Sequence, residues 1–357
     1  MFRRKVNMPE IKIGNVTVSN EGKTFIIAEI GANHNSDIEL AKKTIKAAAE
    51  CGVDAVKFQT YTARELVADK DRVLTYLSNG IEKKETISEL FDRLSLRREY
   101  HRELFDYANS LGLQAFSTPF SLDGLEFLAS LDVPCFKVAA SDVNYVDLLE
   151  KLPEYNKPVM LSLGKCTLGE ADEAINILLN KGCKNLVIMH CVSQYPSPMN
   201  EMNLNTIKTL KSLYPECVIG FSDHSMGITA ALGAVAFGAR VVEKHFTLDK
   251  KLDGPDHWFS MDPSDMKSLV TEIRNLESAM GNPRKMILEC EKNERHKSVR
   301  SLVLKRDLKE GEVIKNEDLL MLRPGWGISP FDKDKVVGMK INKDCKANTV
   351  LVWDLLR

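Results

Sequence analysis

FIIAEIG (residues 25–31) is the first of eight short runs in this sequence that are nearly continuous in apolar residues. The other seven are AVKFQT (55–60), QAFSTPF (114–120), CFKVAA (135–140), PVMLSLG (158–164), LVIMHC (186–191), VIGFSDH (218–224) and VVEKHFT (241–247). Strands without polar alternation are typical of parallel sheets that are covered on both faces. The runs therefore predict eight parallel strands.

Amphipathic helical patterns separate these runs. In residues 38–50 the apolar positions share one face, and Gly52 follows as a helix stop. Similar patterns span residues 97–111, 122–131, 168–180, 203–213, 226–238 and 263–280. Eight strand–helix repeats over about 250 residues favour an α/β fold of the (β/α)8 TIM-barrel type. A doubly wound sheet is the alternative, but it usually stops at about five to seven strands.

The character of the sequence changes after residue 281. Residues 282–297 are polar and dense in charge, which is typical of a linker. Residues 298–357 contain short strand-like runs, tight turns and little helix, and they predict a small β-rich domain. We therefore expect a barrel domain over residues 1–281, a linker over 282–297 and a second domain over 298–357.

Composition excludes two classes of function. The 49 Lys and Arg residues nearly balance the 50 Asp and Glu residues, whereas a general nucleic-acid binder needs a basic excess. No apolar run approaches the roughly 18 residues of a membrane span, and residues 1–14 lack the apolar segment of a secretory signal. The eight cysteines are scattered without a CxxC pair, which is typical of reduced thiols that pack in a cytoplasmic protein.

Polar residues gather at the carboxyl ends of the runs, where a TIM barrel carries its active site. Lys57 and Lys137 each lie inside an apolar run, where a charge is costly without a ligand or partner. They favour an anion site for a phosphate or a carboxylate. Salt bridges to Glu29 or Glu243 are one alternative, and a Schiff-base lysine is another.

Two histidines, His224 and His245, end neighbouring runs beside carboxylates. Two imidazoles with water and a substrate oxygen suit Mn²⁺, Zn²⁺ or Fe²⁺, although a histidine at a strand end is often a hydrogen-bonded core residue. No cysteine is expected at this spot, which disfavours a structural zinc site. In the following loop, LDGPDHWFS (252–260), Asp256 and His257 are candidate substrate contacts unless the loop is merely part of the surface.

Several motifs occur in order along the chain, at one per run. They are Phe25–Asn35, Val53–Tyr61, Phe136–Asp142, His190–Pro196, Gly220–His224, Glu243–Leu248 and Gly254–His257. Together they resemble the sialic acid synthase family, whose members make nonulosonic acids. The carboxyl-terminal region is similar to the antifreeze-like SAF domain of that family.

The resemblance implies a transferase that condenses phosphoenolpyruvate with an N-acetylated aldose of the mannosamine type. The products would be a nine-carbon 2-keto sugar acid, of the N-acetylneuraminate or legionaminate type, and phosphate. A divalent metal, usually Mn²⁺ with Mg²⁺ or Co²⁺ as alternatives, would bind His224 and His245 and act as a Lewis acid on the sugar aldehyde. The sequence does not indicate which acetamido sugar is accepted.

The resemblance also assigns roles to individual residues. The expected catalytic residues are Glu29, Lys57, Lys137, Asp142 and Tyr195. The expected substrate-binding residues are Gln59, Ser141, Ser162, Ser193, Ser222, Asp256 and Arg323. Asp142 and Ser193 stand where some relatives have Glu and Asn. In the family the SAF domain crosses to the partner subunit of a domain-swapped homodimer, so Arg323 would reach the partner's sugar site.

Two other functions are compatible with these residues. A different TIM-barrel aldolase that uses phosphoenolpyruvate or pyruvate would employ Lys137 as its Schiff-base residue. A non-enzymatic protein that binds ice or glycans through its SAF-like end would not need Lys57, His224 and His245 together, so their joint presence disfavours it.

Overall fold

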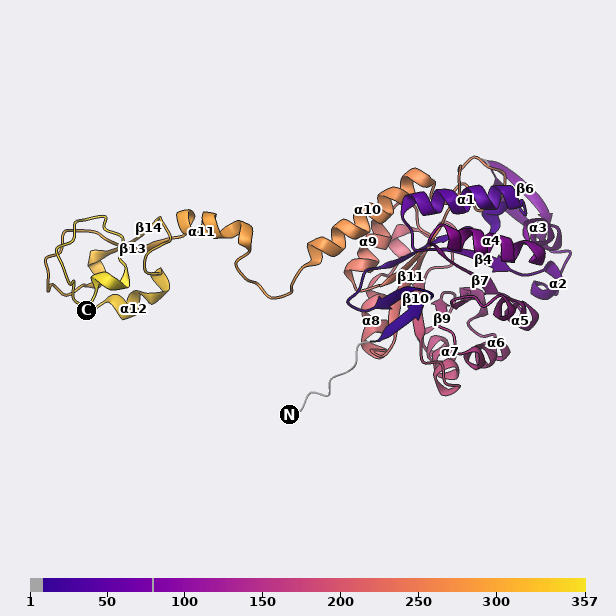
Figure 1. Ribbon diagram of the computed structural model, residues 1–357, viewed down its shortest axis with the longest axis horizontal. Helices are drawn as coiled ribbons and strands as arrows, with labels where there is room; N and C mark the ends of the chain where they lie inside the picture. The colour runs from indigo at the N-terminus through magenta and orange to yellow at the C-terminus, as the bar shows by residue number, and fades with distance from the viewer. Residues whose placement is uncertain (1–8, 79) are drawn as a thin grey trace. The chain divides into compact units, whose positions relative to one another are not determined.

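The computed structural model describes residues 9–78 and 80–357. By their internal contacts these divide into two units, Met1–Gly281 and Asn282–Arg357 (Figure 1). The expectation about a secretory signal rests partly on residues 1–8, which lie outside the described residues. Within the described residues, every helix is too short or too polar to cross a membrane.

The first unit is built on eight parallel strands, which confirms the predicted barrel and rules out the doubly wound sheet. Their order is β7-β4-β3-β12-β11-β10-β9-β8, and β8 also packs beside β7, so the sheet nearly closes on itself. The strands are β3 (Phe25–Glu29), β4 (Ala55–Thr60), β7 (Gln114–Pro119), β8 (Phe136–Val138), β9 (Val159–Leu163), β10 (Leu186–Cys191), β11 (Val218–Asp223) and β12 (Val241–His245).

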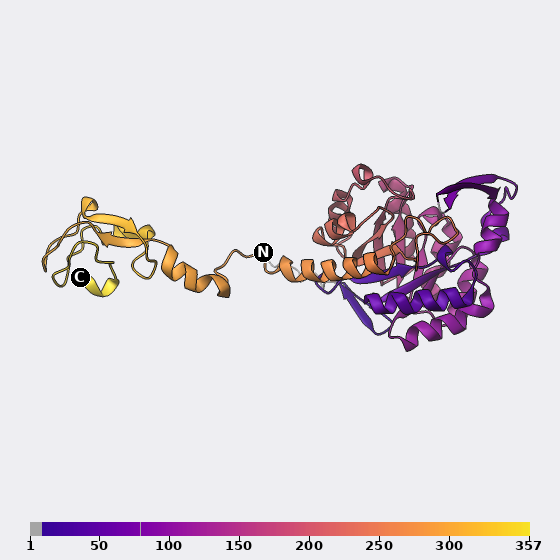
Figure 2. The ribbon, with the colours of Figure 1, turned by 90° about the horizontal axis from the view of Figure 1, so that it is seen from above.

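Helices surround the strands (Figure 2), and their ends follow the expected signals. Gly52, with a φ of 84°, ends the first helix, and Pro263 occupies the first turn of the last helix, where its missing N–H costs nothing. The helices are α1 (Ile38–Cys51), α4 (Arg98–Ser110), α5 (Leu122–Ser130), α6 (Val146–Lys151), α7 (Leu168–Asn180), α8 (Asn205–Leu213), α9 (Thr229–Ala236) and α10 (Pro263–Met280).

Two hairpins of the first unit were not predicted. β1 (Glu10–Ile13) pairs with β2 (Val16–Ser19) near the amino-terminus. β5 (Val73–Ser78) pairs with β6 (Ile81–Thr86) in a long excursion after β4, between the short helices α2 (Ala63–Leu66) and α3 (Ile87–Leu94). Their strands alternate between exposed and less exposed residues, so a search for continuous apolar runs does not detect them.

The second unit has a separate hydrophobic core that includes Leu302, Leu304, Ile341 and Leu351. Its strands β13 (Ser301–Leu304) and β14 (Leu319–Leu322) pair antiparallel, and α12 (Lys333–Val336) follows. The segment expected to be a linker contains a 3-10 turn, η5 (Glu289–Glu291), and most of α11 (Lys292–Ser298). The remaining 3-10 turns are η1 (Ala32–His34), η2 (Ala140–Asp142), η3 (Leu152–Tyr155), η4 (Met199–Glu201), η6 (Asn316–Asp318), η7 (Pro330–Asp332) and η8 (Trp353–Leu355).

Candidate active site

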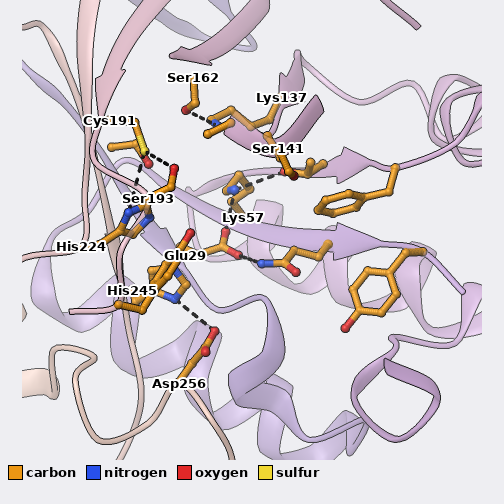
Figure 3. Close-up of a pocket in the computed structure, with 18 of the residues that line it drawn as sticks. Glu29, Lys57, Lys137, Ser141, Ser162, Cys191, Ser193, His224, His245 and Asp256 are labelled. Atoms are coloured by element: carbon orange, nitrogen blue, oxygen red, sulfur yellow. Dashed lines mark hydrogen bonds and ion pairs between the residues drawn. The ribbon is translucent and has the colours of Figure 1, made fainter. Parts of the chain in front are cut away.

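A cavity of about 460 Å³ opens at the carboxyl ends of the barrel strands (Figure 3). The structure brings most of the predicted site residues into it. Those that line the cavity are Glu29, Lys57, Gln59, Lys137, Ser141, Ser162, Ser193, Tyr195, Ser222, His224, His245 and Asp256. Asp142 and Arg323 are predicted site residues that do not line it.

Strand alternation explains which residues reach the cavity. Successive side chains of a strand point to opposite faces, so Glu243 and His245 of β12 face the cavity and Lys244 faces outward. Lys244 instead forms a buried ion pair with Asp223, with 2.7 Å between Nζ and Oδ2. The outward lysine and aspartate are therefore structural, although the sequence places them among the ionisable residues of the strand ends.

Lys57 lies between two buried carboxylates. Its Nζ is 3.0 Å from Glu29 Oε2 and 3.2 Å from Glu243 Oε1, and it donates to Thr118 Oγ1 at 3.2 Å. Burial alone would lower the pKa of Lys57, but the two carboxylates outweigh it and raise the pKa above its usual value. The salt-bridge alternative from the sequence is thus present in the structure, at the same place as the expected anion site.

Lys137 has weaker charge compensation. Its Nζ donates to Ser162 Oγ at 2.6 Å and to the carbonyl of Val138 at 3.1 Å, whereas Glu243 Oε2 is 3.9 Å away. Burial lowers the pKa of Lys137 more than Glu243 raises it. An additional anion beside this ammonium group would therefore be favourable.

The pKa values of Glu29 and Glu243 shift in opposite directions although both carboxyl groups are buried. Burial raises the pKa of Glu29 in spite of Lys57, and the charge of Glu243 adds to the increase. Burial acts in the same direction on Glu243, but Lys137 and Lys57 together lower its pKa to about 2. Glu29, which accepts a hydrogen bond from Gln59 Nε2 at 2.8 Å, is therefore the carboxyl group that takes up a proton more readily.

The histidine pair lies beside these groups. The ring centroids of His224 and His245 are 5.4 Å apart, and the half-exposed ring of Tyr195 lies 4.1 Å from that of His224. Burial lowers the pKa of His224 to about 4 and that of His245 well below its usual value. Both imidazoles are therefore neutral at pH 7.

Cys191 corrects one expectation. The sequence indicated no cysteine near the histidines, yet Cys191 Sγ lies 3.8 Å from His224 Nδ1 and 3.5 Å from Ser193 Oγ. Cys191 is the last residue of β10, and β10 is the neighbour of β11 in the barrel. The order of the strands therefore places Cys191 beside His224, which follows β11. Burial raises the pKa of the Cys191 thiol, which keeps it protonated and makes it a poor metal ligand.

A divalent metal would be compatible with the two histidines. Neutral imidazole is the form that binds metal, and His245 Nδ1 makes no hydrogen bond within the part of the chain that the structure describes. His224 Nδ1 is 2.9 Å from the carbonyl of Val192, which leaves its Nε2 for a ligand bond. Among the described residues no cluster of three or more His, Cys, Asp and Glu could hold a metal ion, so further ligands would have to come from water or substrate.

The loop after β12 contributes one of its two candidate residues. Asp256 lines the cavity with Oδ2 3.5 Å from His245 Nδ1, and burial together with Glu29 raises its pKa to about 7. His257 is fully buried, and its Nδ1 is 2.6 Å from Thr247 Oγ1. The expectation that His257 contacts substrate is therefore wrong, because its ring packs inside the loop.

Asp142 and Arg323 lie outside the cavity. Asp142 belongs to η2, and burial raises its pKa to about 6 although Lys137 and Lys165 act in the opposite direction. Arg323 is exposed in the turn after β14, in the second unit. The expected role of Arg323 stays a prediction.

The sequence missed several residues that line the cavity. Lys165 follows β9, and apolar side chains come from the excursion after β4 and from the end of β7. The apolar group is Tyr61, Leu66, Val67, Ile87, Phe91 and Phe120. The sequence does not indicate these residues because most of them lie on short helices and loops, away from the polar residues at the strand ends.

The chain is similar to two known protein families. Residues 44–285 match the family model described as "NeuB family", and residues 299–357 match that of the SAF domain. The uncharacterized protein MJ1065 of Methanocaldococcus jannaschii is 40% identical over 347 residues, which cover 97% of this chain and 98% of that protein.

Two relatives carry descriptive names. The N,N'-diacetyllegionaminic acid synthase of Legionella pneumophila is 40% identical over 334 residues, covering 92% of this chain and 94% of its own length. A crystal structure of N-acetylneuraminic acid synthetase from Leptospira borgpetersenii is 33% identical with a TM-score of 0.73, and the match covers 81% of this chain and 96% of that chain.

Proposed function

The chain belongs to the NeuB family and ends in a SAF domain, and on this premise we propose that it condenses phosphoenolpyruvate with an N-acetylated aldose of the mannosamine type. The observation that carries the proposal is a single pocket in which two buried lysines lie next to a neutral histidine pair. The lysines suit the binding of an anionic substrate, and the histidines suit a metal ion that polarises a substrate carbonyl group. Two of the relatives are named N,N'-diacetyllegionaminic acid synthase and N-acetylneuraminic acid synthetase. In this proposal the product is of the legionaminate or neuraminate type.

Phosphoenolpyruvate lies against Lys137 in this proposal. The ammonium group, with Ser162 and Ser141 from neighbouring strand ends, neutralises the phosphate, and Ser193 and Ser222 supply further hydroxyl donors. Because no carboxylate of the described residues lies closer than 3.9 Å to Lys137, the arriving anion completes its charge compensation.

The reaction forms a carbon–carbon bond and a carbon–oxygen bond from water to C2, and it breaks the carbon–oxygen bond between C2 and the phosphate. C3 of the enolpyruvate attacks the aldehyde carbon, and the aldehyde oxygen takes up a proton. Water then adds to C2 of the oxocarbenium ion and gives up a proton, for which Glu29 is the base. The tetrahedral intermediate collapses to the 2-keto acid with loss of phosphate. Gln59 and Asp256, which flank Glu29, orient the sugar side.

His224 and His245 would hold a divalent metal, with Mn²⁺ as the first candidate and Mg²⁺ or Co²⁺ as alternatives. Once bound, the metal supplies Lewis-acid polarisation of the aldehyde oxygen. Tyr195, whose ring packs at a tilt against His224, restricts the position of that ring. We further propose that the active species is a domain-swapped homodimer in which Arg323 binds sugar in the partner's site.

The defining test measures phosphate release from phosphoenolpyruvate in the presence of a panel of N-acetylated aldoses. With ¹⁸O in the bridging oxygen of phosphoenolpyruvate, the label is expected in the released phosphate, because the C–O bond breaks. Mass spectrometry should find a nine-carbon keto acid. Absence of phosphate release with every aldose, in the presence of Mn²⁺, would contradict the proposal.

The metal has a test of its own. We expect His224→Ala and His245→Ala to lose Mn²⁺ binding in calorimetric titration and to lose turnover, with unchanged far-ultraviolet circular dichroism. His190→Asn is the matched control, because His190 is a buried histidine of β10 that binds the carbonyl of Met202 at 2.8 Å and does not line the pocket. Full activity of either alanine variant in the presence of a chelator would remove the metal from the proposal.

A second candidate is an aldolase that forms a Schiff base on Lys137. The observation in its favour is that burial lowers the pKa of Lys137, which increases the fraction of neutral amine. Borohydride reduction in the presence of pyruvate separates the two functions. A covalent adduct on Lys137 would favour the aldolase, whereas the condensation predicts an unmodified lysine.

A further inference from the structure

Lys165 is a third lysine of the pocket, and the proposed mechanism gives it no role. It comes two residues after the end of β9 and lines the cavity together with Lys57 and Lys137. Its side chain is exposed, and an exposed lysine is most often merely solvated. The backbone of Lys165, its neighbours and the charge of the pocket distinguish it from such a lysine.

The backbone at Lys165 has a left-handed conformation. Its φ is 56°, which residues with a side chain rarely adopt and which glycine adopts without strain. The preceding residue has no room for a side chain, because a Cβ at Gly164 would lie 2.2 Å from Ser193 Oγ and 3.3 Å from Cys191 Sγ. The chain after β9 is therefore packed against the end of β10, and a tight turn places Lys165 at the mouth of the pocket.

The neighbours of Lys165 are groups that the proposed function places around the phosphate. Ser162, three residues earlier on β9, accepts a hydrogen bond from Lys137 Nζ at 2.6 Å (Figure 3). Burial raises the pKa of Asp142, and the charges of Lys137 and Lys165 both act against this increase, so both ammonium groups lie near the same carboxyl. Lys165 is therefore on the side of the pocket that contains Lys137 and Ser162.

The barrel strands supply little net positive charge to the pocket. Lys57 and Lys137 face Glu29 and Glu243, so lysines and glutamates are equal in number there. Phosphoenolpyruvate carries about three negative charges at pH 7, because its phosphate contributes about two. Within the described parts of the chain, Lys165 forms no ion pair and donates no side-chain hydrogen bond, so its charge is available to a substrate.

We propose that Lys165 is a further substrate-binding residue, which binds the phosphate of phosphoenolpyruvate from the mouth of the pocket while Lys137 binds it from inside. The inference rests on the proposed condensation and adds a residue to its anion site. A contact that is equally strong in the ground state and in the transition state lowers KM and leaves kcat unchanged. The effect of Lys165 is therefore expected in the affinity for phosphoenolpyruvate.

The first experiment measures binding without turnover. Phosphoenolpyruvate and inorganic phosphate are each titrated calorimetrically into the wild type and into Lys165→Met, with Mn²⁺ and without an aldose. We expect the Kd of both ligands to rise about 10-fold in the variant, which is the loss for one charge-assisted hydrogen bond at an exposed position. Pyruvate has the carboxylate but no phosphate, so as a competitor of phosphoenolpyruvate it should have the same inhibition constant in both proteins.

The second experiment measures steady-state kinetics with the aldose that gives the fastest phosphate release. Lys165→Met should raise KM for phosphoenolpyruvate about 10-fold, with kcat and KM for the aldose nearly unchanged. Lys165→Arg keeps the charge and should stay within about threefold of the wild type. The wild-type KM for phosphoenolpyruvate should also rise more steeply with ionic strength than that of Lys165→Met, because salt screens an exposed charge.

Two variants separate loss of the charge from damage to the fold. Lys165→Gly suits the left-handed backbone, so it should lose affinity as Lys165→Met does while its melting temperature stays close to that of the wild type. Lys184→Met removes the same charge at the amino end of β10, outside the pocket, and should leave all these constants unchanged.

The outcomes distinguish the inference from the function on which it rests. Equal Kd values for phosphoenolpyruvate in the wild type and in Lys165→Met would overturn the inference and leave the condensation intact. If pyruvate and phosphate lost the same affinity, Lys165 would bind the carboxylate, and the contact to the phosphate would be wrong. If the wild type did not bind phosphoenolpyruvate at all, the condensation would fail and the inference with it.

Discussion

Lys57 supplies the positive charge that allows Glu29 and Glu243 to remain buried side by side. Its Nζ lies within 3.2 Å of an oxygen of each carboxylate. Removing one partner of a buried ion pair costs about 3 kcal/mol or more. We therefore expect Lys57→Met to lower the free energy of unfolding of the barrel by about that amount at pH 7, as measured by thermal denaturation.

A double variant provides the control for this prediction. In Lys57→Met/Glu243→Gln only Glu29 keeps its charge, so part of the lost stability should return. Because burial already raises the pKa of Glu29, that carboxyl can take up a proton, and the loss in the single variant should shrink toward pH 5. If Lys57→Met were as stable as the wild type at pH 7, Lys57 would not be what stabilises the buried Glu29 and Glu243.

Asp142 makes the stability of the wild-type protein depend on pH. Its pKa rises from 3.8 to about 6 because burial disfavours the charged form. The folded state thus prefers the protonated carboxyl, and the free energy of unfolding decreases as the pH rises from about 4 through 6. We expect Asp142→Asn to raise the melting temperature at pH 7, by an amount equivalent to about 1 to 2 kcal/mol, and to leave it nearly unchanged at pH 4. Equal shifts at both pH values would exclude this origin.

Single residues were predictable where strand alternation applies. Glu29, Lys57, His224 and His245 were found from the sequence because a polar side chain inside an apolar run has few structural explanations. Cys191 was not, because its proximity to His224 depends on the order of strands around the barrel rather than on local sequence.

The hairpin β5–β6 is connected to the loop that carries Asp256. Asp253 Oδ1 accepts hydrogen bonds from Ser78 Oγ and Lys83 Nζ, both at 2.5 Å, and Ser78 Oγ accepts one from the Gly254 amide at 2.9 Å. An exposed ion pair contributes little to stability. These contacts fix the loop at Asp253 and Gly254, and Asp256, two residues after Gly254, lines the pocket.

A variant at this connection should affect the sugar more than phosphoenolpyruvate. We expect Asp253→Ala to raise KM for the aldose about 10-fold, with KM for phosphoenolpyruvate and the melting temperature nearly unchanged, since misplaced substrate contacts of this kind cost one to two orders of magnitude. Asp253→Asn keeps the oxygen acceptor and should restore part of the lost affinity. Glu82→Ala is the control, because Glu82 pairs with Lys84 on the same exposed hairpin and with no other basic residue in the described ranges. An equal change in both KM values would indicate a general structural defect.

At the level of elements, the sequence predicted the barrel strands to within a few residues, since each is a continuous apolar run between turn signals. It missed the excursion between β4 and α4, which contains α2, β5, β6 and α3. Those elements are short and largely exposed, and their positions are set by packing on the barrel. The apolar group that lines the pocket comes mainly from this excursion, so the polar side of the site was predictable and the apolar side was not.

At the scale of the whole molecule, each of the units Met1–Gly281 and Asn282–Arg357 has a large hydrophobic core of its own, and these two cores share no residues. Each unit thus has the means to keep its own structure. A barrel with its site residues in place would need the second unit only if that unit supplies a residue to the reaction. Arg323, exposed in the turn after β14, is the residue for which we propose this role.

Coexpression of two defective chains tests whether Arg323 acts across subunits. In a mixed dimer of a Lys137→Ala chain and an Arg323→Ala chain, one site combines an intact barrel with an intact SAF domain if the domains are exchanged. Random pairing in a twofold dimer would then restore about a quarter of the wild-type activity per site. If Arg323 serves its own chain, every site carries one defect and no activity returns.

The control is a pair of chains whose defects both lie in the barrel, Lys57→Ala and Lys137→Ala. Here every site of a mixed dimer lacks one lysine however the SAF domains are arranged, so activity should stay at the level of the single variants. Restoration in this control would mean that activity returns by another route than exchange of Arg323. Restoration confined to the first pair would show that the arginine of one chain completes the pocket of the other, because a point substitution in the SAF domain leaves the barrel of its own chain intact.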